Sequence, residues 1–162
     1  GLIPPPLAIP TVKFLQMLGL NSKYLGLILF YCAIYMPFSI FFITGFIKTV
    51  PRELDESAII EGCNPFRMFV SIILPLLKPV IVTTTIFCFM FIWNDFTWPL
   101  YLLNDSSKWT IPLTVFSFKS KYGTMWELVF ADLIIAALPV CILYFVAQDS
   151  IVEGMTAGAV KG

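Results

Sequence analysis

Three long apolar runs, separated by shorter polar segments, dominate the hydrophobic pattern of this chain. Residues 24–47 contain no charged side chain and lie between Lys23 and Lys48. Residues 79–103 and 128–146 form the other two runs. Because a helix needs about 20 apolar residues to cross the hydrocarbon core of a membrane, each run predicts a transmembrane helix.

A polar pair interrupts the run 79–103. Asn94 and Asp95 lie there, close to Trp93, Trp98 and Tyr101. Aromatic clusters of this kind are typical of a membrane interface, so the helix is predicted to reach the surface near Trp93. Polar groups at membrane depth are costly and often functional, which makes Asn94 and Asp95 candidates for a substrate pathway. The alternative, which the neighbouring tryptophans favour, is that both residues cap the helix end and face water.

The other stretches are assigned by their composition. Residues 1–20 are apolar but rich in proline, which predicts the end of a truncated span in a C-terminal fragment. Residues 104–123 are polar enough for an external loop, and 147–162 form a glycine- and alanine-rich tail on the same side as the segment 51–75. Asp132 lies only five residues after Glu127, and no role is assigned to it.

The segment 51–75, PRELDESAIIEGCNPFRMFVSIILP, mixes charged and apolar residues between two spans. Glu53, Ser57 and Glu61 recur at four-residue spacing and give one polar helical face. Gly62 is suited to end that helix, because glycine takes the left-handed conformation without steric cost. The segment therefore begins with an amphipathic helix that stops at Gly62.

A second helix is predicted after the glycine. Asn64 followed by Pro65 is typical of an N-cap with proline at the first helical position. An apolar stripe at helical spacing follows and includes Phe66, and Pro75 is expected to interrupt it. The prediction is a helix, a glycine elbow and a second helix at a membrane surface. The alternative is a plain polar loop between two spans.

Composition narrows the classes of function. The chain is 59% apolar and 12% charged, which is too apolar for an ordinary soluble domain. Ten basic and ten acidic residues leave no net charge to attract nucleic acid. There is no histidine, the commonest general base and metal ligand. The four cysteines form no CxxC pair and are interpreted as small apolar residues.

The spacing in the segment 51–75 resembles a known motif. Glu56-Ser57-Ala58, three residues, Gly62, nine residues and Ile72-x-Leu74-Pro75 are similar to the EAA motif of ABC-importer permeases. Ser57 replaces an alanine of that pattern, one small residue for another. The resemblance implies that the segment is a cytoplasmic coupling helix that contacts an ATPase subunit. The residues it assigns to this contact are Glu53, Glu56, Ser57, Ala58, Glu61, Gly62, Asn64, Phe66 and Arg67.

Two further stretches resemble one branch of that family in particular. The run Trp93-Asn94-Asp95-Phe96, followed by Trp98-Pro99-Leu100, resembles a run of sugar-importer permeases. The terminus 153–162, EGMTAGAVKG, is similar to that of the maltose-permease branch. This likeness favours carbohydrate over amino-acid, peptide or phosphate as the solute.

The resemblance implies an all-α, polytopic transmembrane helical bundle with the type I ABC-importer permease fold. It implies a multi-pass subunit in a bacterial or archaeal cytoplasmic membrane. The expected partners are ABC ATPase subunits that bind ATP and Mg²⁺, a second permease subunit and an extracytoplasmic sugar-binding protein. The chain has no P-loop, so it is not expected to hydrolyse ATP or to be an enzyme.

Other functions stay open beside this one. An ABC importer for a non-sugar solute would share the same coupling motif. A membrane-embedded enzyme or scaffold would need clustered titratable groups near the bilayer, and the acids of 51–75 have no histidine beside them. A channel would need no ATPase partner. No metal site and no cofactor in the chain itself are expected.

Overall fold

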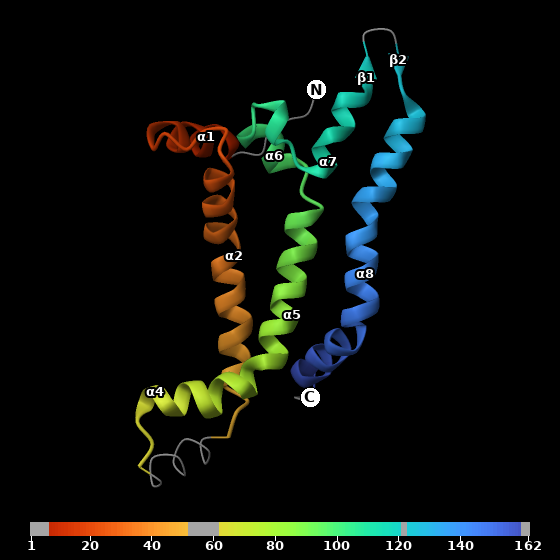
Figure 1. The fold of residues 1–162 in the computed structure, drawn as a ribbon. Coiled ribbons are helices and arrows are strands. Elements are labelled where there is room, and N and C mark those ends of the chain that lie inside the picture. The colour runs from red at the N-terminus through yellow and green to blue at the C-terminus, as the bar shows by residue number, and fades with distance from the viewer. Residues whose placement is uncertain (1–6, 52–61, 121–122, 160–162) are drawn as a thin grey trace. The chain divides into compact units, whose positions relative to one another are not determined.

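The computed structural model describes residues 7–51, 62–120 and 123–159, and the side chains of 119–120 and 149–159 lie outside the description (Figure 1). Helices make up almost all of its regular structure, as the all-α prediction requires. The elements are α1 (Ala8–Met17), α2 (Tyr24–Ile47), α4 (Pro65–Met68), the π-helical turn η1 (Phe69–Ile73), α5 (Leu74–Trp93), α6 (Thr97–Leu102), the 3-10 turns η2 (Ser106–Lys108) and η3 (Val115–Phe118), α7 (Ile111–Thr114) and α8 (Trp126–Ala159). The antiparallel strands β1 (Lys119–Ser120) and β2 (Gly123–Thr124) complete this list.

Three helical stretches in the described residues are long and apolar enough to cross a membrane: Tyr24–Ile47, Pro65–Trp93 and Trp126–Gln148. The first has the bounds that the apolar run predicts. The prediction of an all-α transmembrane protein is confirmed. α1, with ten residues, is about 15 Å long, which is well short of a span. Its assignment to a truncated span stays a prediction.

The helix that leads into the second span passes through Pro75, so the expected interruption at this proline is wrong. The physical reason is the π-helical turn just before it, in which the N–H of Leu74 donates to the carbonyl of Phe69, five residues back. Proline would leave the carbonyl of Ser71 without its α-helical donor. Because the wider turn has already replaced the four-residue pairing, the helix continues.

α8 extends well beyond the predicted run 128–146 and includes Pro139 in its interior. Many of its apolar side chains are exposed, among them Ile134, Ile142 and Phe145. Exposed apolar surface on a helix of this length is typical of contact with lipid.

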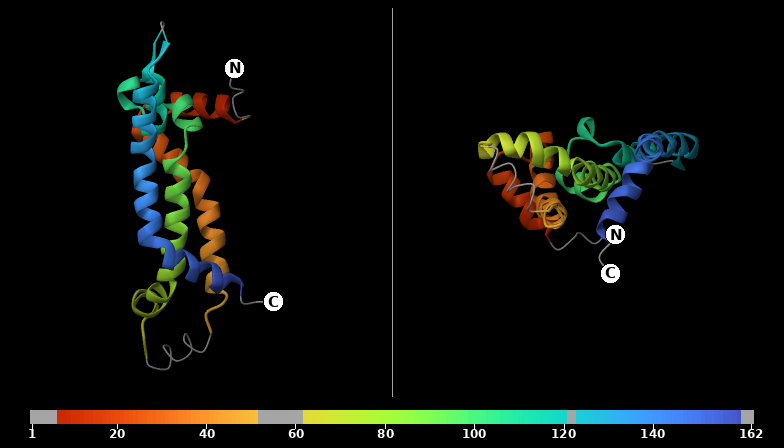
Figure 2. Two further views of the ribbon diagram at one scale, coloured as in Figure 1. Left: turned by 90° about the vertical axis from the view of Figure 1, so that its right-hand side faces the viewer. Right: turned by 90° about the horizontal axis from the view of Figure 1, so that it is seen from below.

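The chain forms two compact units, and each is described by itself. The first contains residues 1–34 and 90–142, and the second contains 35–89 and 143–162. In the first unit, α1 lies across the beginning of α2 rather than along it (Figures 1 and 2). Leu102, Leu103 and Leu113 are among the best buried apolar residues described in this unit, with 0–2% of their surface exposed.

Hydrogen bonds join distant segments of the first unit. The N–H of Ser22 donates to the carbonyl of Leu102 at 3.1 Å, and the Ser22 hydroxyl accepts from the N–H of Asp105 at 3.1 Å. Nearby, Gly26 allows a close approach, because a Cβ at this position would lie 2.5 Å from the carbonyl oxygen of Leu20. The turn before α2 is therefore fixed to the end of α6.

In the second unit, the later half of α2 packs against α5. The hydroxyl of Ser39 lies 3.7 Å from the sulfur of Cys88, and the rings of Phe42 and Phe87 are 6.4 Å apart. Between α4 and the long part of α5 the helix bends sharply (Figure 1). This stretch contains the π-helical turn, Pro75 and Pro79, which are the usual causes of such a bend.

Candidate functional site

The first candidate site is the elbow, residues 62–68, at the start of the second span. Gly62 has a φ of +75°, the left-handed conformation that the sequence predicts. A Cβ at Gly62 would meet nothing within 4 Å, so backbone conformation alone favours glycine here. The first predicted helix of this segment, with Glu53, Glu56, Ser57, Ala58 and Glu61, lies outside the described residues.

A side-chain cap starts the helix after the elbow. Asn64 has extended backbone angles, and its Oδ1 accepts a hydrogen bond from the N–H of Phe66 at 3.0 Å. Pro65 occupies the first helical position, where its missing N–H costs nothing. The predicted N-cap and proline are confirmed. The cap satisfies one of the N–H groups that a helix start leaves unpaired.

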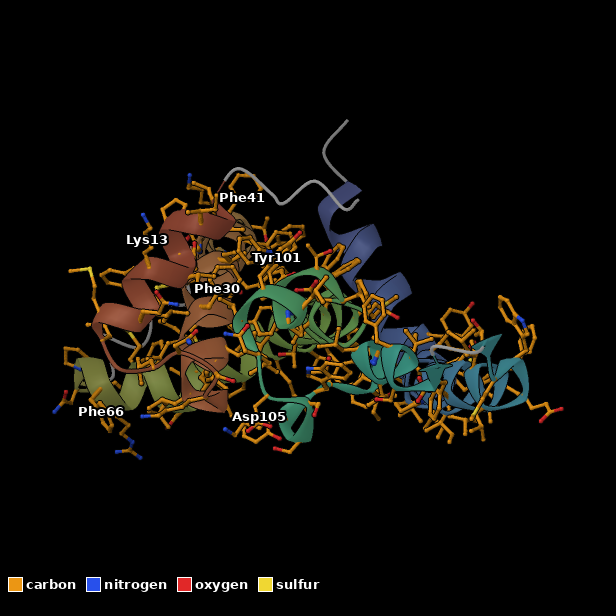
Figure 3. The ribbon with its side chains drawn as sticks, turned by 90° about the horizontal axis from the view of Figure 1, so that it is seen from above. Lys13, Phe30, Phe41, Phe66, Tyr101 and Asp105 are labelled. Atoms are coloured by element: carbon orange, nitrogen blue, oxygen red, sulfur yellow. The ribbon has the colours of Figure 1, made fainter. Side chains whose placement is uncertain are left out.

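The residues after the cap present an exposed apolar face. Phe66 is 75% exposed, and Phe69 and Val70 are 47% and 43% exposed. Figure 3 shows Phe66 near the free end of α4. Arg67, in the last turn of α4, is exposed as well. Exposed aromatic residues beside arginine are the residue types enriched at protein interfaces. The elbow therefore offers a surface suited to contact with another protein.

The second candidate is the 93–98 joint, residues 93–98, between α5 and α6. α5 ends at Trp93, where the sequence predicts the helix to end. Asp95 uses both of its carboxylate oxygens. Oδ1 accepts from the N–H groups of Thr97 at 2.8 Å and Trp98 at 3.3 Å, and Oδ2 accepts from the hydroxyl of Tyr31 at 2.8 Å. Asn94 is exposed, and its Nδ2 donates to the carbonyl of Met90 at 2.8 Å.

This geometry is the capping arrangement that the sequence offers as the alternative to substrate contact. Asp95 holds the start of α6, and Asn94 holds a carbonyl at the end of α5. A role for either residue in a substrate pathway stays a prediction.

Sequence reasoning missed the partners of these residues. Tyr31 has only 8% of its surface exposed and is 64 positions away from Asp95. The indole N–H of Trp93 donates to the carbonyl of Ala136 at 2.8 Å. A buried phenol or indole needs a hydrogen-bond partner, and this general rule is the only signal the sequence offered. The rule does not identify the residue that serves as the partner.

Asp132 also has a partner that the sequence did not indicate. Its Oδ1 lies 2.9 Å from the hydroxyl of Thr114, which is 2.6 Å from the carbonyl of Ile111. A hydroxyl has one proton and donates to one of the two acceptors at a time. The contact joins α7 to α8 within the first unit. Among the described residues no three His, Cys, Asp or Glu side chains gather as metal ligands would.

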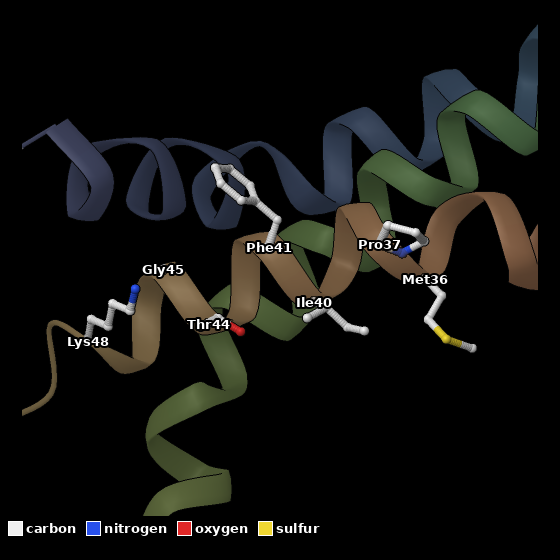
Figure 4. A pocket seen from close by; sticks show the side chains of 7 residues that line it. All are labelled: Met36, Pro37, Ile40, Phe41, Thr44, Gly45 and Lys48. Atoms are coloured by element: carbon white, nitrogen blue, oxygen red, sulfur yellow. The ribbon is translucent and has the colours of Figure 1, made fainter.

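A hollow of about 550 Å³ lies along α2 in the second unit (Figure 4). Met36, Ile40, Thr44 and Lys48 follow one another at four-residue spacing along it, and Lys48 lies at one end. The other described lining residues are Pro37, Phe41 and Gly45. With one lysine and one threonine in an otherwise apolar wall, this groove lacks a set of groups for catalysis.

Comparison with known proteins places the chain among transport proteins. Residues 3–157 match the family described as "Binding-protein-dependent transport system inner membrane component". The chain is 38% identical over 154 residues to a putative ABC transporter permease protein of Caldicellulosiruptor sp., a match that covers 95% of this chain and 56% of that relative.

Two further relatives have more specific names. A probable starch degradation products transport system permease protein of Thermoanaerobacterium thermosulfurigenes is 43% identical over 136 residues, which cover 84% of this chain and 50% of the relative. A multiple sugar-binding transport system permease protein of Streptococcus mutans is 39% identical over 155 residues, with 94% and 56% covered. The chain thus spans about half the length of the curated relatives it matches.

Proposed function

The chain belongs to the family of binding-protein-dependent transport system inner membrane components, and we propose that it forms part of the permease subunit of an ATP-driven sugar importer. Family membership and the three apolar helices make it a protein of the inner membrane, as the sequence predicts. The family is one of transport components rather than enzymes. We place ATP hydrolysis, with its bound ATP and Mg²⁺, in separate ATPase subunits.

One observation carries the choice of sugar as the solute. Relatives that match most of this chain are named for the transport of starch degradation products, multiple sugars and maltodextrin. The proposed solute is therefore a mono- or oligosaccharide. A secreted sugar-binding protein would deliver it, and a second permease subunit would complete the pathway.

The elbow supports the proposed coupling to an ATPase. Its helix start is satisfied by Asn64, while Phe66 and Arg67 remain exposed. In the proposed mechanism, closure of the ATPase dimer moves this cytoplasmic elbow. Because the elbow is continuous with the helix that leads to Trp93, its movement shifts a transmembrane helix directly. The shift changes the side of the membrane to which the pathway opens.

Transport by the reconstituted importer tests this proposal. The full-length permease is assembled in proteoliposomes with its ATPase, second permease and binding protein. Uptake of maltodextrins, raffinose and an arabino-oligosaccharide is measured with and without internal ATP, and an amino-acid mixture serves as the control. We expect uptake of at least one sugar that needs both ATP and the binding protein. Uptake of the amino acids alone, or sugar flux without ATP, would contradict the proposal.

A further inference from the structure

The carboxylate of Asp95 is the centre of the 93–98 joint. Its Oδ1 accepts from two backbone N–H groups at the start of α6, and its Oδ2 accepts from the hydroxyl of Tyr31 on α2. All three donors come from this chain, at 2.8–3.3 Å. Hydrogen bonds to an ionised acceptor are stronger than neutral ones, and those of a part-buried carboxylate are costly to lose. One side chain therefore fastens α6 to α2.

Aromatic contacts reinforce the same connection. The ring of Phe30, next to Tyr31, lies 4.2 Å from the ring of Trp98 with the planes tilted by 49°. On the other side of Asp95, Trp93 donates its indole N–H to the carbonyl of Ala136 in α8. The six residues of the joint thus connect α5 and α6 to both α2 and α8 within the first unit.

α6 depends on these contacts because of its length. It has six residues, and an isolated helix this short does not persist in water. Its described cap residue, Phe96, makes no side-chain capping bond, so Asp95 supplies the acceptor for the first N–H groups. Loss of this carboxylate would free the start of α6.

We propose that Asp95 is a positioning residue, and that its hydrogen bond with Tyr31 makes α6 move together with α2 during transport. Donors of this chain use three of the roughly four acceptor positions of the carboxylate, which supports a role in holding α6. α2 precedes the segment 51–75 in the chain and α5 follows it, so the joint fastens α6 to α2 in addition to its chain connection with α5. The inference rests on the proposed function, since it concerns a step of the transport cycle.

The test uses the assembled full-length importer with four variants. Tyr31→Phe removes only the hydroxyl, Asp95→Ala removes all three hydrogen bonds, and Asp95→Asn keeps an acceptor for the amides. Tyr24→Phe is the matched control, because Tyr24 begins the same helix and is 55% exposed. Should Asp95→Ala fail to fold, sugar uptake by Tyr31→Phe still decides the question.

The first measurement is amide hydrogen exchange at Thr97 and Trp98. We expect exchange about tenfold faster in Asp95→Ala, the factor that matches loss of a hydrogen bond to a charged acceptor. Asp95→Asn should restore most of the protection, and the control should match the wild type. Unchanged exchange in Asp95→Ala would overturn the proposal, and this readout does not depend on sugar transport.

The second measurement separates positioning from solute binding. In Tyr31→Phe and Asp95→Ala we expect sugar uptake per ATP hydrolysed to fall about threefold or more, with KM for the sugar within about twofold of the wild type. A rise in KM at unchanged maximal uptake would instead make Asp95 a solute ligand and overturn the proposal. Absence of sugar uptake by the wild type would overturn the proposed function, whereas normal uptake by all four variants would overturn only this inference.

Discussion

The elbow and the 93–98 joint are both short polar breaks beside long apolar helices, but they differ in how their contacts are completed. In the joint, both oxygens of Asp95 have donors from the chain itself, and Trp93 and Tyr31 have acceptors. In the elbow, Asn64 caps the helix start, and the apolar side chains that follow are exposed on the surface of the described chain. The joint is thus complete within the chain, whereas the elbow offers a surface for something outside it.

The exposed face of the elbow could contribute free energy to binding a partner. Burying a phenylalanine side chain contributes about 1.5–3 kcal/mol, and Phe66 is still 75% exposed. That free energy is available to a partner that covers the residue. The contrast predicts that substitutions in the joint change folding stability, while those in the elbow change association.

The largest effect is expected from Trp98→Ala in the joint. The substitution removes the ring that lies against Phe30, and we expect a loss of about 3 kcal/mol in the free energy of unfolding. Thermal unfolding in detergent measures it. Trp126→Ala is the control, since Trp126 is 63% exposed and should cost much less. Equal losses for the two tryptophans would remove the distinction between joint and surface.

Phe66→Ala in the elbow should change association with the ATPase subunit and leave folding stability almost unchanged. We expect stability to change by less than about 0.5 kcal/mol, because the side chain is exposed. Association with the ATPase subunit should weaken by about 2 kcal/mol, close to thirtyfold, as for an anchor residue. Phe41→Ala provides the control, because Phe41 is 76% exposed but lies on α2. The affinity for the ATPase subunit is measured on the solubilised permease. Equal affinities of Phe66→Ala and Phe41→Ala would contradict the assignment of the elbow as the ATPase contact.

Gly62→Val tests whether the elbow needs its left-handed turn. At a φ of +75° a side chain costs about 1–2 kcal/mol, and a β-branched one suffers most. Gly62→Asn should cost less, because asparagine tolerates this conformation. Gly45→Ala serves as a helical control with equally open space around it. Affinity for the ATPase should fall in the order wild type, Gly62→Asn, Gly62→Val. Equal affinities of Gly62→Val and the wild type would exclude a role for the turn.

The smallest effect concerns the exposed turn at Asp105, which follows α6. Hydrogen bonds from Ser107, together with Lys108 at 3.0 Å, lower the pKa of this carboxyl from 3.8 to about 2. A carboxyl with a lowered pKa contributes stability above pH 3.8, and the contribution is lost as the pH falls toward 2. The turn should therefore keep its structure unchanged between pH 7 and pH 4.

Carboxyl titration by NMR checks this prediction, with Ser107→Ala as the comparison. The variant should titrate at a higher pH than the wild type, because it loses the hydroxyl donor at 2.7 Å. Identical midpoints would show that the Ser107 hydroxyl does not set the pKa.

The elbow could be predicted from the sequence because its determinants are local. Asn64 caps the N–H of a residue only two positions away, and Gly62 sets its own backbone angle. Apolar length alone likewise predicts α2. The partners of the joint could not be predicted in this way. Tyr31 and Asp95 are 64 positions apart, and any of several polar groups near a helix end could have met that carboxylate.

Pro75 shows the opposite failure, in which a sound local rule gives the wrong result. Proline in a helix interior removes a hydrogen bond, and an end of the helix is the expected outcome. The rule assumes regular four-residue pairing before the proline. A π-helical turn at Phe69–Ile73 had already changed that pairing, and the residue types of this turn give no sign of it.

That wide turn also determines which way the second span faces. One extra residue in a turn rotates every later side chain by about 100° around the helix axis relative to a regular α-helix. Leu77, Val80 and Thr84 are inward-facing with this phase. Removal of a single residue from 69–73 would therefore leave the cap at Asn64 intact and yet turn a different stripe of α5 inward. The length of this stretch, more than its composition, should be what evolution is least free to alter.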